Sequence, residues 1–419
     1  MKNLKSTIGF VGTIILTSIS TFAQDSLPNN IAISAKKDSS LVVTKPDTKF
    51  LTFDKEKFNN WVHAIVPTDS CTKHPKAQVT FIYPLGTNGI GSYKIPNQFS
   101  LNTHWGVNGG VKGFEFGGLL NVNKGDVAGV QIAGIANSTL GKSEGIILSG
   151  ISNFATGDAR GVHMAGIANT YKGKSEGIFL AGITNISADT ALGTHIAGIG
   201  NFAYQSTLGM QIAYTNITRK SLIGMQIGFL NYAKNVHGTQ IGFLNISDTI
   251  SKGCPIGFLN IVRHGLYEFE LTGGEFMSHL NFKVGTDRFY TIFKVGRTQN
   301  TQPEAYTAGI GWGTYLPLAA KHKIGIDASA NGFIQQNLDY DNNNNLMLNK
   351  LDITYKWQFS KHFSLMAGPS FNHLLTEKKQ NTSIENRQLN IPPTIYSTSN
   401  QNNKNQFWLG FSAGIAFKL

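Results

Sequence analysis

Long apolar runs, charged residues and cysteines are all scarce in this chain of 419 residues. After residue 23, no stretch approaches the roughly eighteen apolar residues of a transmembrane helix, so a membrane role would have to be that of a β-barrel. Charged residues make up only 14% of the chain. The net charge of +12 suits contact with anionic lipopolysaccharide, although an excess of lysine in loops and tail explains it equally well.

Only two cysteines occur, Cys71 and Cys254. Export would make a disulfide between them chemically accessible, and the sequence leaves open whether they meet. No nucleophile, acid–base pair or metal-ligand cluster stands at an informative spacing. We therefore expect a protein that is not an enzyme and that uses no cofactor, no metal and no nucleic-acid partner.

The N-terminus predicts export. An apolar run from Ile8 to Ile19 follows two lysines, and the small residue Ala23 before Gln24 marks a signal-peptidase site. We therefore assign residues 1–23 to a signal peptide. The other segments before the repeats are a polar lead segment, residues 24–76, and the first strands, residues 77–112.

Glycine, in contrast, is abundant, and much of it belongs to one repeated phrase. The phrase Gly-x-x-apolar-Ala-Gly-Ile-x-Asn recurs ten times over residues 113–260, at spacings of 14 to 16 residues. In the copy that begins at Gly129, Val130 and Ile132 alternate with Gln131 and Ala133, which is the period of a strand. Each repeat is therefore predicted to be one strand followed by a polar turn.

A second period of 32 residues relates Gln131, His163 and His195. A duplicated unit of two strands favours an antiparallel up-and-down meander, although duplication within a parallel solenoid leaves the same trace. The two histidines would lie about 10 Å apart, too far to share a metal ion. We expect instead a polar, uncharged stripe that faces inward, made of Gln131, His163, His195, Gln211, Gln226 and Gln240.

Residues 261–419 lack the phrase and alternate more cleanly, as in the apolar series Leu351, Ile353, Tyr355, Trp357 and Phe359. A polar stretch over residues 376–405 is predicted to be an exposed loop. The last strand, up to Leu419, has one apolar face, which suits a tilted strand of a transmembrane barrel. It resembles the C-terminal signature of bacterial outer-membrane barrels.

The repeats resemble a known family. The phrases Gly129-Val-Gln-Ile-Ala-Gly-Ile-Ala-Asn137 and Gly224-Met-Gln-Ile-Gly-Phe-Leu-Asn231 are similar to the Gly-Leu-Gln-Leu-Gly-Leu-x-Asn repeats of leptospiral-type surface-repeat proteins, which also occur in Bacteroidetes. The longer copies depart from that phrase by one extra alanine. The resemblance implies an outer-membrane or cell-surface location and no particular activity.

These patterns predict an all-β fold in which repeats and C-terminal strands close one antiparallel up-and-down outer-membrane β-barrel of roughly twenty strands. The alternative is a β-solenoid array with a smaller C-terminal barrel of about eight strands. The predicted function is a non-enzymatic outer-membrane pore or structural surface element. The alternative is a surface-exposed repeat adhesin or binding protein that a C-terminal barrel anchors. Outer-membrane lipid and lipopolysaccharide are the expected partners, and the sequence names no specific ligand.

Overall fold

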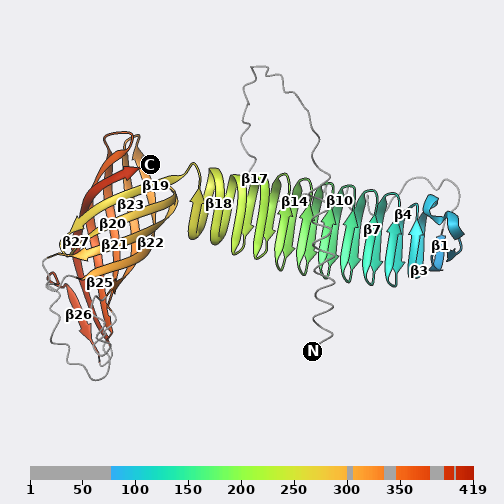
Figure 1. Cartoon of the computed structure of the whole chain (residues 1–419), viewed down its shortest axis with the longest axis horizontal. Helices are drawn as coiled ribbons and strands as arrows, with labels where there is room; N and C mark the ends of the chain where they lie inside the picture. The colour runs from blue at the N-terminus through green and yellow to red at the C-terminus, as the bar shows by residue number, and fades with distance from the viewer. Residues whose placement is uncertain (1–76, 300–304, 335–345, 378–390, 401–402) are drawn as a thin grey trace, which may run out of the picture. The chain divides into compact units, whose positions relative to one another are not determined.

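The computed structural model describes residues 77–299, 305–334, 346–377, 391–400 and 403–419 (Figure 1). The assigned signal peptide, the lead segment and Cys71 lie outside them. The described chain is almost entirely strand, and its helical part is the short 3-10 helix η1 (Gly89–Lys94). No described helix has the length and apolar character needed to cross a membrane.

Residues 77–262 form a β-solenoid in which each coil contributes one strand to each of two parallel ladders. The first ladder contains β4 (Gly110–Gly117), β6 (Val127–Ala133), β8 (Ser143–Ser149), β10 (Ala159–Ala165), β12 (Ser175–Ala181), β14 (Ala191–Ala197) and β16 (Thr207–Ile212). The second contains β5 (Leu120–Asn123), β7 (Ala136–Thr139), β9 (Ser152–Ala155), β11 (Ala168–Tyr171), β13 (Thr184–Ser187) and β15 (Gly200–Ala203).

The ends of the solenoid are less regular. At its start lie β1 (Ala77–Ile82), β2 (Leu85–Gly86) and β3 (Pro96–Asn108). β3 pairs with both β4 and β5, and β1 lies parallel to β3 on its other side, so the parallel stacking begins at β1. At its other end the longer strands β17 (Thr215–Ile227) and β18 (Leu230–Val262) continue both ladders without a break.

The prediction of one antiparallel barrel of roughly twenty strands is therefore wrong, and the alternative of a solenoid followed by a smaller barrel is confirmed. Gly129, Gly145 and Gly161 stack in register on parallel strands, so every coil repeats the same backbone path. The period of 32 residues is a duplication of two coils. The extra residue of the longer phrases is absorbed at the bend between two strands, as at Gly134 and Ile135, and not in a bulge.

Close stacking explains why each phrase begins with glycine. Gly145 has a φ of 118°, in a region that other residues rarely adopt. A Cβ atom there would lie 1.9 Å from the carbonyl oxygen of Gly129 in the preceding coil. Any side chain at this position would force neighbouring coils apart.

Residues 266–418 form the barrel, in which strands follow one another antiparallel and β27 pairs back with β19. Of its nine strands, β26 pairs only with β27, so eight strands close the ring. They are β19 (Leu266–Gly274), β20 (Met277–Thr286), β21 (Phe289–Thr298), β22 (Tyr306–Ala319), β23 (His322–Ile334), β24 (Leu346–Gln358), β25 (Phe363–Glu377) and β27 (Asn403–Lys418), with β26 (Tyr396–Ser399) outside the ring.

The two ends of the barrel differ in the lengths of their connections. One end, which we call the short-turn end, has connections over residues 287–288, 320–321 and 359–362. At the other, the long-loop end, residues 299–305, 335–345 and 378–402 connect strands, together with the two-residue β19–β20 turn over residues 275–276. The loop predicted over residues 376–405 is only partly described, and there β25 extends to Glu377 and β26 interrupts it.

Candidate functional site

The outer wall of the barrel is apolar and exposed. On β24, Leu351, Ile353 and Tyr355 are 40–49% exposed, whereas Asp352 and Thr354 between them are buried. The alternation predicted from the sequence is thus confirmed for this strand. Neighbouring strands add further exposed apolar side chains, among them Phe269, Leu271, Leu280, Phe293, Val295, Trp312, Leu365, Leu409, Phe411 and Phe417.

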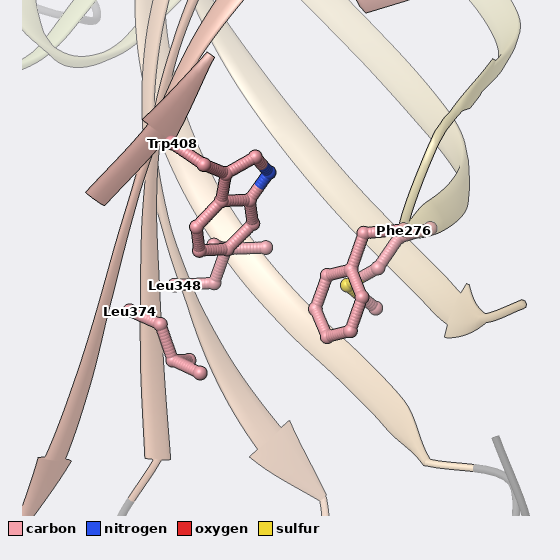
Figure 2. Packing of buried hydrophobic residues seen from close by; sticks show 5 residues of the cluster. Phe276, Leu348, Leu374 and Trp408 are labelled. Carbon is pink, nitrogen blue, oxygen red and sulfur yellow. The ribbon is translucent and has the colours of Figure 1, made fainter. Parts of the chain in front are cut away.

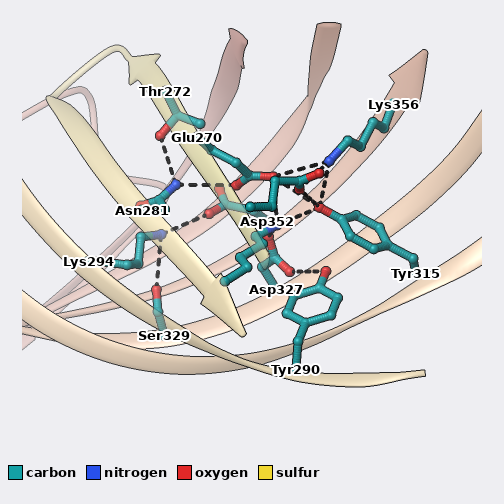
Figure 3. A network of polar contacts seen from close by, with 12 residues as sticks. Glu270, Thr272, Asn281, Tyr290, Lys294, Tyr315, Asp327, Ser329, Asp352 and Lys356 are labelled. Carbon is teal, nitrogen blue, oxygen red and sulfur yellow. Dashed lines mark hydrogen bonds and ion pairs between the residues drawn. The ribbon is translucent and has the colours of Figure 1, made fainter. Parts of the chain in front are cut away.

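The inner wall carries buried ions. Lys283 contacts Glu270 at 2.9 Å and Asp327 at 2.6 Å, and Lys356 pairs with Glu268. Figure 3 shows Glu270, Asp327 and Lys356, with other members of this network, converging from different strands. The set contains four acids and four lysines, so its formal charges balance: Glu268, Glu270, Asp327, Asp352, Lys283, Lys294, Lys350 and Lys356.

Tyrosines complete this network. The hydroxyl group of Tyr315 accepts hydrogen bonds from Lys283 at 3.0 Å and from Lys356 at 2.9 Å, and it lies 2.7 Å from a carboxylate oxygen of Glu268. Tyr290 donates to Asp327 at 2.6 Å. Buried charges with this many partners hold one arrangement firmly, because breaking any pair would leave an uncompensated charge.

An apolar cluster fills the barrel toward its long-loop end. Phe276, Met277, Leu348, Leu374 and Trp408 are all at most 3% exposed, and Figure 2 shows Phe276, Leu348, Leu374 and Trp408 of this cluster near one another. Glu275, in the β19–β20 turn, accepts a hydrogen bond from Trp408 Nε1 at 2.7 Å and another from the backbone of Phe411. This turn is thereby held against the inner wall.

Little space remains inside the ring. A cavity of about 20 Å³ lies near the short-turn end, between Glu268, Tyr315, Lys356 and Lys418, which is about the size of one water molecule. An eight-stranded barrel is just wide enough for its inward side chains to fill it. The described interior is therefore occupied largely by side chains.

The interior of the solenoid is also polar, and its main feature is a ladder of asparagines. Asn169 Nδ2 donates to the carbonyl oxygen of Leu180 at 2.8 Å and to Asn185 Oδ1 at 2.9 Å in the next coil. Its own Oδ1 accepts from Asn153 at 2.9 Å. The same contacts recur along Asn121, Asn137, Asn153, Asn169, Asn185, Asn201, Asn216, Asn231, Asn245 and Asn260.

The six residues predicted to form an inward polar stripe lie inside the solenoid and not along a barrel lumen. Gln131, His163, His195, Gln211, Gln226 and Gln240 are all at most 2% exposed. Ile147 and Phe179 occupy the same register position in intervening coils, so the stripe is interrupted. The last four occupy consecutive coils. Of these, the three glutamines are hydrogen-bonded in a row, since Gln240 donates to Gln226 at 2.9 Å and Gln226 to Gln211 at 2.8 Å.

The two histidines are buried as neutral rings. His163 Nε2 lies 3.2 Å from the carbonyl oxygen of Arg160, so it carries the proton, and Nδ1 accepts from Tyr171 at 2.6 Å. Burial lowers the pKa of His163 to about 4 and that of His195 to about 3. The ring of Phe179 stacks between them at 5.0 and 4.7 Å. No described group of His, Cys, Asp or Glu residues could hold a metal ion.

Glu115 is the one acidic residue inside the described solenoid, and its side chain is fully buried. Its two oxygens accept hydrogen bonds from the side-chain amides of Asn102, Asn108, Asn123 and Gln131 at 2.6–3.1 Å. Burial raises the pKa of Glu115, and these four donors oppose that rise. It stands at the register position of Gln131, in the first full coil.

The sequence interpretation missed the ionic network and the asparagine ladder. The ionic network has a signal in the sequence, because Glu268, Glu270 and Lys283 occupy positions that alternate with the apolar residues Phe269, Leu271, Phe282 and Val284. The asparagine of each phrase was noted only as a repeat marker. A buried amide in every copy is the sign of a hydrogen-bonded ladder along stacked coils.

No protein-family model matches the chain, and no curated protein matches it either.

Proposed function

We propose that the barrel inserts into a bacterial outer membrane and anchors the solenoid, which serves as a non-enzymatic structural or binding element. The observation that carries the proposal is the radial arrangement of the barrel. Its outward side chains are apolar and exposed, while its ions face inward in balanced pairs. A water-soluble barrel would reverse this pattern, whereas a lipid bilayer requires it.

An anchor is favoured over a pore. The ionic network and the apolar cluster around Trp408 together fill the described ring, and the remaining cavity of about 20 Å³ could hold one water molecule. The predicted pore depended on the wide lumen of a barrel of roughly twenty strands. The chain forms an eight-stranded ring instead, and a ring of that size has no wide lumen through which ions could pass.

The connections suggest which side of the membrane the solenoid occupies. In outer-membrane barrels short turns face the periplasm and longer loops face the outside. Leu266, the first residue of the barrel, pairs with Gly285 next to a short turn, and Lys418 pairs with Glu268 at the same end. The solenoid precedes Leu266 directly, so we propose that it is periplasmic and that the long loops reach the cell surface.

This orientation restricts where the protein could act as a surface adhesin. A surface adhesin anchored by a barrel would place its contacts in the long-loop end, of which β26 is a described and fully exposed part. The solenoid would then act on the other side of the membrane. The resemblance of its repeats to surface-repeat proteins remains compatible with an outer-membrane protein of this arrangement.

Ile353→Lys tests whether the wall faces lipid. Ile353 lies in the middle of β24 and is 44% exposed. A lysine at the midplane of the bilayer should destabilise the barrel folded in phosphatidylcholine vesicles, lowering its free energy of unfolding by about 2 to 4 kcal/mol. Urea titrations, followed by the heat-modifiable migration of the folded barrel in gels, measure the change.

Phe359→Lys is the matched control. Phe359 directly follows β24 at the short-turn end and is 43% exposed. Near the membrane interface the same charge should lower the free energy of unfolding by only about 0 to 1 kcal/mol. Equal effects of the two lysines would show that the wall does not face hydrocarbon.

A further inference from the structure

After the buried Glu115, charge is confined to one edge of the solenoid. Every Lys, Arg, Asp and Glu between Phe116 and Val262 lies within the five positions before a repeat glycine, on the segments that lead from one coil to the next. This charged edge carries nine basic and six acidic side chains, and Arg160 pairs there with Glu176 of the next coil at 3.0 Å. The rest of each coil has none.

The opposite edge and the outward face of the first ladder are apolar. At the bend between the two strands of a coil, Ile199 and Tyr214 are each 57% exposed. Further along this apolar edge Tyr214, Phe229, Phe243 and Phe258 stack with ring centres 4.6–4.9 Å apart. On the face of the first ladder, Met164 and Ile178 are 42% and 45% exposed, whereas the outward face of the second ladder mixes apolar residues with Ser and Thr. The solenoid therefore exposes apolar side chains and buries its amides, a reversal of the usual arrangement in water.

The depth of the uncharged part matches one leaflet of a bilayer. From Gly145, next to the charged edge, to Ile151 on the apolar edge, the chain advances six residues, about 20 Å at the rise of a parallel strand. One leaflet with its headgroups is about 20–22 Å thick. The stacked strands satisfy one another's backbone hydrogen bonds, as a structure in contact with lipid requires.

The chain also keeps the last coil close to the membrane. β18 ends at Val262 and β19 begins at Leu266, four residues later. Four residues span at most about 14 Å. If the barrel is inserted, the solenoid must begin within this distance of the bilayer, on the short-turn side.

We propose that the solenoid lies in the phospholipid leaflet on the short-turn side, with its apolar edge and the face of the first ladder among the acyl chains and its charged edge at the headgroups. This rests on the proposed insertion of the barrel. The basic excess of the charged edge suits anionic phospholipid. A second copy of the chain on the flat face of the first ladder would leave the narrow apolar edge uncovered, whereas the acyl chains of a leaflet cover both together.

The test uses single cysteines in the full-length protein with Cys71→Ser and Cys254→Ser. Each carries an environment-sensitive fluorophore at one of three positions: Ile199→Cys on the apolar edge, Lys220→Cys on the charged edge and Leu351→Cys on the barrel wall. Ile199, Lys220 and Leu351 are all exposed, so the label should not disturb packing. The protein is reconstituted in vesicles of phosphatidylcholine and phosphatidylglycerol, and quenching by spin-labelled lipid and by aqueous iodide is compared.

Lipid quenching of the Ile199 probe as strong as that of the Leu351 probe, with the Lys220 probe quenched by iodide alone, is the expected result. If Leu351 is quenched by lipid but Ile199 by iodide, the inference fails and the barrel proposal stands. If Ile199 is quenched by lipid and Leu351 is not, the barrel proposal fails and the solenoid binds lipid independently. An Ile199 probe shielded from both quenchers, in a protein that crosslinks as a dimer, would assign this surface to a second copy and overturn the inference.

Discussion

At the scale of single residues, the interior of the solenoid holds two histidines as neutral, hydrogen-bonded rings. His163 has a partner for each ring nitrogen, Tyr171 and the carbonyl oxygen of Arg160. His195 has Ser175 on Nε2, at 2.8 Å. These partners accommodate a neutral imidazole, and no carboxylate among their described partners favours a charged ring. Protonation of either ring would therefore oppose folding.

The pH dependence of stability follows from this burial. Unfolded histidine has a pKa near 6.5, whereas the folded values are about 4 for His163 and about 3 for His195. Below pH 6.5 the unfolded chain binds more protons, so stability present above that pH is lost as the pH falls toward the folded values. From pH 7 to pH 5 each histidine should lower the free energy of unfolding by about 2 kcal/mol.

The double variant His163→Gln and His195→Gln isolates this effect. Glutamine occupies the same register position in other coils, so it should fit. Guanidinium unfolding of both full-length proteins at pH 7 and pH 5 gives the comparison. Glu115, whose raised pKa acts in the opposite direction, is common to both proteins and cancels. Identical pH responses would contradict the assignment of two buried neutral histidines.

At the scale of elements, neighbouring coils are held together by glycine, which permits close approach, and by asparagine, which bridges the gap. Both residues could be identified from the sequence as repeat positions, but their roles depend on strand direction. Alternation of apolar and polar residues is the same in parallel and antiparallel strands, so the pattern around Gln131 could not distinguish them. Near-identical turns such as Gly141 to Glu144 were the evidence for stacked coils.

Asn169→Ala tests the bridging role. The change removes donors to Leu180 and Asn185 and leaves Asn153 Nδ2 without one acceptor, all in a buried site. We expect a loss of about 1 to 3 kcal/mol in the free energy of unfolding. Thr170→Ala, on the half-exposed outward side of the same strand, should change it by less than about 0.5 kcal/mol.

A second substitution sharpens this test. Asn169→Asp keeps the shape of the side chain, but an ionised carboxylate cannot donate to Leu180 or Asn185. It should destabilise the protein more than alanine does at pH 7. Guanidinium midpoints rank the variants by stability. An Asp variant as stable as the wild type would show that the asparagine ladder does not stabilise the solenoid.

At the scale of the whole molecule, the sequence predicted the class of fold and the faces of the C-terminal strands, but not the division into two architectures. Alternation on β24 and β27 is a local property, and it correctly placed Ile353 and Leu409 outside. Closure is not local. That eight strands close a ring depends on the pairing of Phe269 with Phe417, which is far away in sequence. The lumen network also joins residues as distant as Glu268 and Lys356.

The central claim is an outer-membrane barrel with its solenoid on the periplasmic side, and cysteine labelling in intact bacteria tests it most directly. In the Cys71→Ser and Cys254→Ser background, cysteine replaces the exposed residues Thr398 on β26, Lys361 in a short turn and Lys142 on the charged edge.

A membrane-impermeant maleimide should label Thr398→Cys in intact cells. It should label Lys361→Cys and Lys142→Cys only after the outer membrane is permeabilised, because short turns and the preceding solenoid share the periplasmic side. Labelling of Lys142→Cys in intact cells, to the same extent as Thr398→Cys, would contradict the account.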